Sequence, residues 1–396
     1  MRVFWVALFV LVACWLSSPF YGPKVGPVNF AYSLVLIYLV RSKFRFSIYI
    51  VPAVLYILLS PVIGQLVISS FCISACNSFF GAGDPLLYGY LQGFRLILAI
   101  LVISYCSDHK ICSPETVVVC CRFLIVGFFC ASVIQSLAFY LGFTLGSIFP
   151  SGGLMYGSLR FDALYGEPNH VHSWLVPACG FLIFTRASGY KLYCLLGIAV
   201  LVWSFSLAWS IVFVSLLFLT PYQDQKLQQR KYSFIIVSSL LIVSMAAFYK
   251  SMDVGDYGKI ALELGSLNER SGTVIAAFEI LKDHLMFGYG IGYSPYLLIN
   301  TDLFLQNPSI NLSHLGRQNV MSTPVQIVGE LGLVGFFLTI LALARYFRFL
   351  WHYRLIGLAA LLSLPYLAVG SGLVAIPHLL TLAAIPALVK LRIPPD

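Results

Sequence analysis

Residues 46–68 have the sequence FSIYIVPAVLYILLSPVIGQLVI, a run without charge and with few polar side chains. About 20 apolar residues in a row is the length at which an α-helix crosses the hydrocarbon core of a bilayer. Comparable runs recur from one end of the chain to the other. They are too long for membrane β-strands and lack the alternation of apolar and polar residues that such strands show. The sequence therefore predicts an all-α, polytopic membrane protein.

The composition agrees with this fold class. The chain has 396 residues, of which 60% are hydrophobic and 10% charged, and its mean hydropathy is +0.90. A soluble domain of this length would need more charge on its surface. The net charge of +9 does not indicate nucleic-acid binding, because Lys and Arg also hold cytoplasmic loops on their side of a membrane. Most of the ten cysteines lie inside apolar runs, no zinc-binding spacing occurs, and we expect neither a metal nor another cofactor.

The apolar runs predict about twelve transmembrane helices. Five segments between or after them are basic, and placing all five in the cytoplasm puts both termini there as well. The run at 192–220 lies between two basic segments and must cross an even number of times, so we expect a hairpin that turns near Ser204–Ser206. The first run resembles a signal peptide but lacks a small-residue cleavage site, and we interpret it as the first span. The expected spans lie near 3–20, 27–40, 46–68, 87–106, 117–141, 173–186, 192–204, 206–220, 233–249, 324–344, 355–370 and 372–389, and the basic segments are 41–45, 186–191, 226–231, 345–348 and the tail with Lys390 and Arg392.

This topology divides the chain into three parts. Residues 1–249 hold the first nine spans and a short outer loop at 142–172, residues 250–322 form one large outer loop, and residues 323–396 hold the last three spans. Inside the large loop, NERSGTVIAAFEILKDHLMFG (268–288) predicts an amphipathic helix with Asn268 as N-cap and Gly288 as its stop. Such a helix lies on the membrane surface, covers a cavity or packs against its own loop. Its expected apolar stripe consists of Val274, Ala277, Phe278, Leu281 and Leu285.

Three arginines fall on the outer side, where the positive-inside tendency does not require them: Arg160, Arg270 and Arg317. The planar guanidinium group binds phosphate oxygens in pairs, so three of them around a membrane pocket would suit a phosphorylated lipid. The alternative is that they are scattered surface residues with carboxylate neighbours. Arg95 lies deep inside the span at 87–106, where a charge usually faces an internal cavity. It could instead pair with Asp84 or with a carbonyl group of a neighbouring helix.

Polar residues also gather in SLRFDALYGEPNHVHSW (158–174). Pro168 indicates a turn there, and Asn169 can cap the following span. This would place Glu167, His170 and His172 at the membrane surface, where a carboxylate or an imidazole could accept a proton from a sugar hydroxyl. In the simpler interpretation Glu167 only orients Arg160 and the histidines face water.

Several motifs of other function classes are absent. The sequence has no Walker loop, and GYGIG (288–292) follows a predicted helix instead of a strand, so it does not indicate a dinucleotide site. It also has no DxD motif of a metal-dependent, nucleotide-sugar transferase. A reaction that uses a lipid-linked sugar needs neither a nucleotide nor a metal.

Three motifs, taken in order, resemble the O-antigen polymerase and O-antigen ligase superfamily of bacterial membrane glycosyltransferases. The first is RFDALYGEPN (160–169), with Ala163 where glycine is common. The second is Arg270 followed by HLMFGYGIG (284–292), with His284 in the place of the usual proline. The third is QIVGELGLVG (326–335), at the entry to a span. The resemblance covers roughly residues 145–345.

One departure favours the polymerase branch of this superfamily. Ligases usually carry His-Asn just before the Gln and Glu of the third motif, where this chain has Met321 and Ser322. The histidine thought to act as the base in ligases is therefore missing, unless His314 replaces it.

The resemblance implies an enzyme of the bacterial inner membrane with its site facing the periplasm. The donor would be a glycan on undecaprenyl pyrophosphate, and a sugar hydroxyl of another lipid-linked unit would attack its anomeric carbon. Arg160, Arg270 and Arg317 would stabilise the departing pyrophosphate, and Glu167 or Glu330 would act as base or orient the hydroxyl. Glu330 lies about two turns inside its span, so a purely structural role is the alternative. The further expected substrate-binding residues are Asn169, His170, His314 and Arg95.

The same resemblance implies partners and leaves other functions open. The partners would be the bilayer, the lipid-linked oligosaccharide, a chain-length regulator and a flippase, without nucleic acid. A ligase that transfers glycan to a lipid or protein acceptor is the second interpretation. A transporter or flippase of lipid-linked sugars is the third, and an inactive scaffold, which would not account for the arginines, is the fourth.

Overall fold

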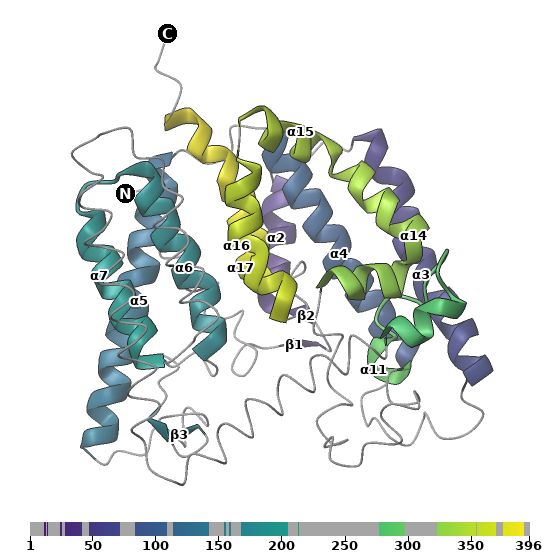
Figure 1. Ribbon diagram of the computed structural model, residues 1–396, viewed down its shortest axis with the longest axis horizontal. Coiled ribbons are helices and arrows are strands. Elements are labelled where there is room, and N and C mark those ends of the chain that lie inside the picture. The colour runs from purple at the N-terminus through teal and green to yellow at the C-terminus, as the bar shows by residue number, and fades with distance from the viewer. Residues whose placement is uncertain are drawn as a thin grey trace.

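A computed structural model gives the fold. It describes residues 24–25, 28–41, 47–71, 84–108, 114–141, 154–155, 158–159, 168–204, 277–297, 323–353, 355–369 and 375–391, together with the single residues 12, 14 and 213. This part of the chain is almost entirely helical, as the sequence predicts, and the helices stand side by side as a bundle (Figure 1). Two small β-hairpins, which the sequence did not predict, are the exception.

The helices follow the apolar runs closely. Their bounds are α2 Phe30–Arg41, η1 Ile48–Ile50, α3 Val51–Phe71, α4 Pro85–Asp108, α5 Pro114–Tyr140, α6 Pro168–Thr185, α7 Tyr190–Ser204, α11 Ser294–Leu297, α14 Thr323–Ala342, α15 Ala344–His352, α16 Ile356–Val369, α17 Ile376–Ala384 and η6 Ile385–Leu391. Residues 277–283 are helical as well. The antiparallel hairpins pair β1 Lys24–Val25 with β2 Val28–Asn29, and β3 Leu154–Met155 with β4 Ser158–Leu159.

Four helices of the described residues are long and apolar enough to cross a membrane: Ile48–Ser69, Pro85–Cys106, Pro114–Ala138 and Val325–Ala342. They coincide with four of the predicted spans, so the prediction of a helical membrane protein is confirmed. Helices α2, α6, α7, α16 and α17 fall on five further predicted spans but are not among these four candidates. The predicted spans at 3–20, 206–220 and 233–249 lie outside the described residues, as does the turn of the expected hairpin, and the number twelve stays a prediction.

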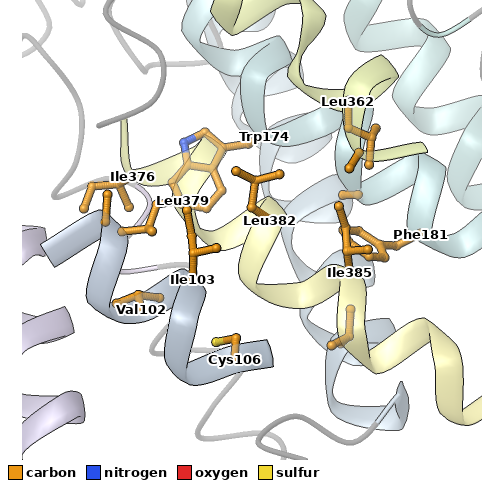
Figure 2. Packing of buried hydrophobic residues seen from close by; sticks show 14 of the residues in the cluster. Val102, Ile103, Cys106, Trp174, Phe181, Leu362, Ile376, Leu379, Leu382 and Ile385 are labelled. Atoms are coloured by element: carbon orange, nitrogen blue, oxygen red, sulfur yellow. The ribbon is translucent and has the colours of Figure 1, made fainter. Parts of the chain in front are cut away.

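Two groups of helices make up the bundle. Helix α5 packs against α6 and α7, while α3 packs against α4 and α14. Helix α17 joins the groups, because it contacts both α4 and α6. Figure 2 shows this junction, where Leu379 and Leu382 of α17 lie near Ile103 of α4 and Trp174 of α6. Since lipid tails are as apolar as leucine, close van der Waals packing of such side chains holds membrane helices together.

The two ends of the bundle differ. Helix α15 and the connection between α6 and α7 lie at the upper end in Figure 1, whereas α11 and both hairpins lie at the lower end. The basic segments at 186–191 and 345–348 are thus at the same end, as expected if both face the same side of a membrane.

Candidate functional site

The candidate site centres on a glycine-rich segment, Gly288–Tyr293, that follows the helix at 277–283. Gly288, Gly290 and Gly292 have φ values of 73°, 96° and 79°, which L side chains rarely adopt. The Gly288 N–H donates to the carbonyl oxygen of His284 at 2.7 Å and closes a turn. The helix itself ends at Asp283, five residues before the predicted stop. The expected N-cap, Asn268, lies outside the described residues.

The predicted apolar stripe of this helix is only half right. Ala277 and Leu281 are buried, but Phe278 and Leu285 are 49% and 47% exposed. Ile280 takes their place, because the helix turns Ala277 and Ile280 into a small cluster with Val67 and Ile68 of α3. Val274 lies outside the described residues.

Helix α14 is interrupted at Gly332, which has φ 66° and ψ −176°. Such a break leaves backbone groups without a partner inside the helix. The residues after the break find partners in the segment before Gly288: Leu333 N–H donates to the Leu285 carbonyl at 3.0 Å, and Val334 N–H to the Met286 carbonyl at 3.1 Å.

The carbonyl groups before the break are satisfied by the glycine-rich segment itself. Tyr289 N–H donates to Gly329 at 2.9 Å, and Gly290 N–H donates to the Glu330 carbonyl at 3.0 Å. From α3, the Tyr56 hydroxyl lies 2.9 Å from the Leu331 carbonyl oxygen and 2.7 Å from that of Phe287, so it ties helix and segment together. Segment and interrupted helix therefore complete each other's hydrogen bonds.

Small residues of α3 and α4 let this backbone come close. A Cβ on Gly290 would overlap the backbone of Gly64 in α3, and one on Gly292 would lie 2.9 Å from the Gly89 Cα in α4. Gly64 and Gly89 lie inside candidate spans, about 6 to 8 Å from the span ends at 1.5 Å per residue. The sequence analysis assigned this segment to an outer loop and did not predict that it lies between α3, α4 and α14.

Glu330 is buried at the centre of this arrangement. The Ser294 hydroxyl donates to its Oε1 at 2.6 Å, and the Gln326 Nε2 donates to the same oxygen at 3.2 Å. The backbone N–H groups of Gly292 and Ser294 also bond to the carboxylate. Four donors thus converge on one side chain, as burial of a carboxylate requires. They fix the start of α11 against α14.

Tyr289 extends this network, with its hydroxyl 3.2 Å from the Ser294 Oγ. The buried Tyr289 hydroxyl thus serves as a hydrogen-bonding group of the site.

Arg95 of α4 is half-buried and lies one turn after Gln92 in the same helix. Its Nε donates to the Tyr32 hydroxyl and its Nη1 to the Gln92 Oε1, both at 3.0 Å. The guanidinium carbon also lies 5.2 Å from the centre of the Tyr32 ring, a cation–π distance. Asp84, the partner considered in the sequence analysis, instead accepts the Leu86 N–H at 2.9 Å at the start of α4. Both hydrogen-bond partners of Arg95 among the described residues are thus neutral.

Gln92 connects Arg95 to the glycine-rich segment. Its Nε2 donates to the Tyr88 hydroxyl at 3.0 Å, its Oε1 accepts from Arg95, and its Cγ would lie 3.3 Å from a Cβ on Gly292. Gly292 in turn donates to Glu330. Glu330 therefore bonds to the glycine-rich segment directly, whereas Arg95 is connected to it only through Gln92.

The structure says less about the other predicted site residues. Asn169 and His170 fall in the first turn of α6, which begins at Pro168, but the structure does not describe their side chains. His172 is completely buried in α6, so the expectation that it faces water was wrong. The turn expected at Pro168 is instead the first position of the helix, a place that suits proline because no N–H is needed there. The residues outside the described part are Arg160, Glu167, Arg270, His314 and Arg317.

Tyr56, Ser60, Gln92 and Ser294 were not predicted from the sequence. Ser60 belongs to the site because its Oγ accepts the Ile291 N–H at 2.9 Å. The signal that could have found these residues is the glycine spacing in α4, Gly89 and Gly93, beside the GYGIG motif. Such small residues permit close backbone approach in membrane helices.

Within the described ranges, no group of three His, Cys, Asp or Glu side chains is arranged to hold a metal ion. A comparison of the chain with protein-family models, curated proteins and solved structures finds no match in any of the three. The chemistry of the site is thus argued from its own residues.

Proposed function

We propose that the chain is a bacterial inner-membrane polymerase of a surface polysaccharide, an O-antigen or an exopolysaccharide. It joins repeat units carried on undecaprenyl pyrophosphate, at a site that faces the periplasm. The proposal combines the resemblance of the three sequence motifs with one structural observation, the position of Arg95.

Arg95 is a charged group inside a candidate span, with a phenol and an amide as its hydrogen-bond partners. Placing arginine at the centre of a membrane helix costs about 2.5 to 3.5 kcal/mol in insertion experiments, and such residues usually serve a function. Because neither partner is a carboxylate, the positive charge of the guanidinium group is not compensated by them and can attract an anion. The fork of an arginine binds the oxygens of a phosphate in pairs, as it does those of a carboxylate, and a lipid pyrophosphate carries such a group at the membrane.

In the proposed reaction a sugar hydroxyl attacks the anomeric carbon of the donor, and the bond to the pyrophosphate oxygen breaks. The hydroxyl proton passes to a base, and the negative charge that develops goes to the leaving pyrophosphate. Arg160, Arg270 and Arg317 stabilise that charge, and Arg95 assists from inside the bundle. Glu167 is the better candidate for the base, since the Glu330 carboxylate already accepts hydrogen bonds from four donors.

A deletion strain complemented with the wild-type gene tests this function. A polymerase deletion leaves one repeat unit attached to the acceptor and removes the ladder of longer chains in gel analysis of the surface glycan. Loss of all attachment would contradict the polymerase and support the ligase. An unchanged ladder would contradict both.

A transporter of lipid-linked sugars is the second candidate, and the interruption of α14 favours it. Transporters often bind their substrate at discontinuous membrane helices. Purified protein in liposomes with a fluorescent lipid-linked oligosaccharide separates the two functions. Movement of the label between leaflets without any change in its chain length would indicate the transporter, and longer products would indicate the polymerase.

A further inference from the structure

Four apolar side chains around the glycine-rich segment have no cover among the described residues. Phe278, Leu285, Met286 and Phe287 are 49%, 47%, 55% and 57% exposed. Three of them are consecutive, and a contiguous exposed run of this kind in water would be an aggregation hazard. Something apolar therefore covers them in the working protein.

The surroundings of this patch identify the cover. The carbonyl groups of Leu285 and Met286 bond to α14, and that of Phe287 to Tyr56 of α3. Both helices are candidate spans. Leu59 of α3 and Phe337 of α14 are 61% and 63% exposed. The segment that carries the patch is therefore bonded to two candidate membrane helices that themselves expose apolar side chains.

The charged residues just before the patch fit the same picture. Lys282 and Asp283 are exposed, and they end the helix at 277–283. A polar end followed at once by exposed apolar side chains is the pattern of a segment that passes from the interface into the acyl-chain region.

We propose that residues 285–297, within the large loop, are a re-entrant membrane insertion. Lipid acyl chains cover Leu285, Met286 and Phe287, and the Glu330 carboxylate acts as the positioning residue that holds the insertion between α3, α4 and α14. This inference does not depend on the proposed polymerase function.

The backbone of the segment explains why a positioning residue is needed. Non-helical backbone at membrane depth is tolerated only where protein satisfies its polar groups. The bonds to α14 satisfy Tyr289 and Gly290, and the bond to the Ser60 Oγ satisfies Ile291. Of the next three N–H groups, that of Tyr293 donates to the Gly290 carbonyl at 3.2 Å, and those of Gly292 and Ser294 have the Glu330 carboxylate as their acceptor. Loss of this carboxylate would leave two backbone donors unpaired, and the insertion would open.

The test of the insertion uses the full chain in lipid nanodiscs, with a genetically encoded environment-sensitive fluorophore at position 286 or at position 282. We expect the fluorophore at 286 to be quenched by lipids that carry a spin label on the acyl chain and to resist aqueous iodide. The fluorophore at 282 should show the reverse. Equal iodide quenching at the two positions would overturn the insertion.

The positioning role is tested in the same labelled protein. Glu330→Ala and the milder Ser294→Ala should each raise iodide quenching at 286, while Ser69→Ala, at an exposed serine of α3 that bonds only within its own helix, should not. Monodisperse elution of each variant shows that it is folded. If folded Ser294→Ala and Glu330→Ala both keep position 286 as protected as in the wild type, Glu330 does not hold the insertion.

Discussion

Replacement of Gly290 by alanine should destabilise the protein strongly, although it adds only one methyl group. The φ of 96° at this position is unfavourable for an L residue, and the left-handed conformation costs about 1 to 2 kcal/mol. The new Cβ would also overlap the Gly64 backbone, which cannot move without shifting α3. Overpacking of this kind adds about 1 to 3 kcal/mol. Together the two effects predict a loss of roughly 3 kcal/mol or more, about a hundredfold in the folding equilibrium.

The matched control for this substitution is Gly357→Ala in α16, where nothing lies within 4 Å of the added Cβ. Alanine favours a helix over glycine by about 1 kcal/mol, so the control should be neutral or slightly stabilised. Thermal unfolding in detergent, followed by intrinsic fluorescence, compares the three proteins. The order Gly290→Ala, wild type, Gly357→Ala in rising Tm is expected. A Tm for Gly290→Ala equal to that of the wild type would refute the close approach of the segment to α3.

Three further outcomes are expected. Tyr56→Phe should lower the free energy of unfolding by about 1 to 3 kcal/mol, because two carbonyl groups lose their shared donor. Tyr49→Phe, at an exposed position, should change it little. Equal denaturant midpoints for the two variants would contradict this expectation. Arg95→Gln should shorten the polysaccharide ladder, and Arg95→Lys should restore it in part, because lysine returns the charge without the planar guanidinium fork. The control Arg348→Gln should leave the ladder unchanged. A normal ladder for Arg95→Gln would exclude a role of this arginine in binding the donor. Arg160→Ala and Arg270→Ala should each remove long chains while the protein remains inserted at wild-type levels, and wild-type chain lengths in both would exclude the phosphate-binding assignment.

The helices could be predicted from the sequence because each depends on a local property. A long apolar run such as 46–68 must satisfy its backbone internally in lipid, and only a helix does so within one segment. The predicted spans at 87–106 and 117–141 match α4 and α5 for the same reason. The stop predicted at Gly288 falls five residues beyond the observed helix end at Asp283, because glycine marks the left-handed position and not the last helical turn.

The position of the glycine-rich segment could not be predicted in this way. Its place between α3, α4 and α14 depends on contacts between residues far apart in the chain, such as Tyr56 with Leu331 and Gly64 with Gly290. Hydropathy assigns a polar or glycine-rich stretch to water. It contains no information on which helices such a stretch will pack against. The predicted apolar stripe of the helix at 277–283 was wrong at Phe278 and Leu285, which are exposed. A periodic pattern shows which side chains are apolar, but it does not show whether protein or lipid covers them.

The candidate site lies between these cases. Glu330 was found through the third motif of the resemblance, and Arg95 because a charge in an apolar run is conspicuous. In the structure Glu330 bonds to the glycine-rich segment, and Arg95 bonds to Gln92, which lies beside that segment. Ser294 and Gln92 were missed because an uncharged polar residue carries no such signal.

The break in α14 affects how the protein is made. The ribosome completes residues 285–290 before residues 329–334, so the groups that replace the missing helix bonds exist before α14 emerges. An incoming α14 can therefore adopt its bent shape as soon as it enters the bilayer, with no delay for a later part of the chain. A gene rearranged so that α14 is synthesised first would send a helix with exposed amide and carbonyl groups into lipid, and we expect quality-control proteases to remove much of it.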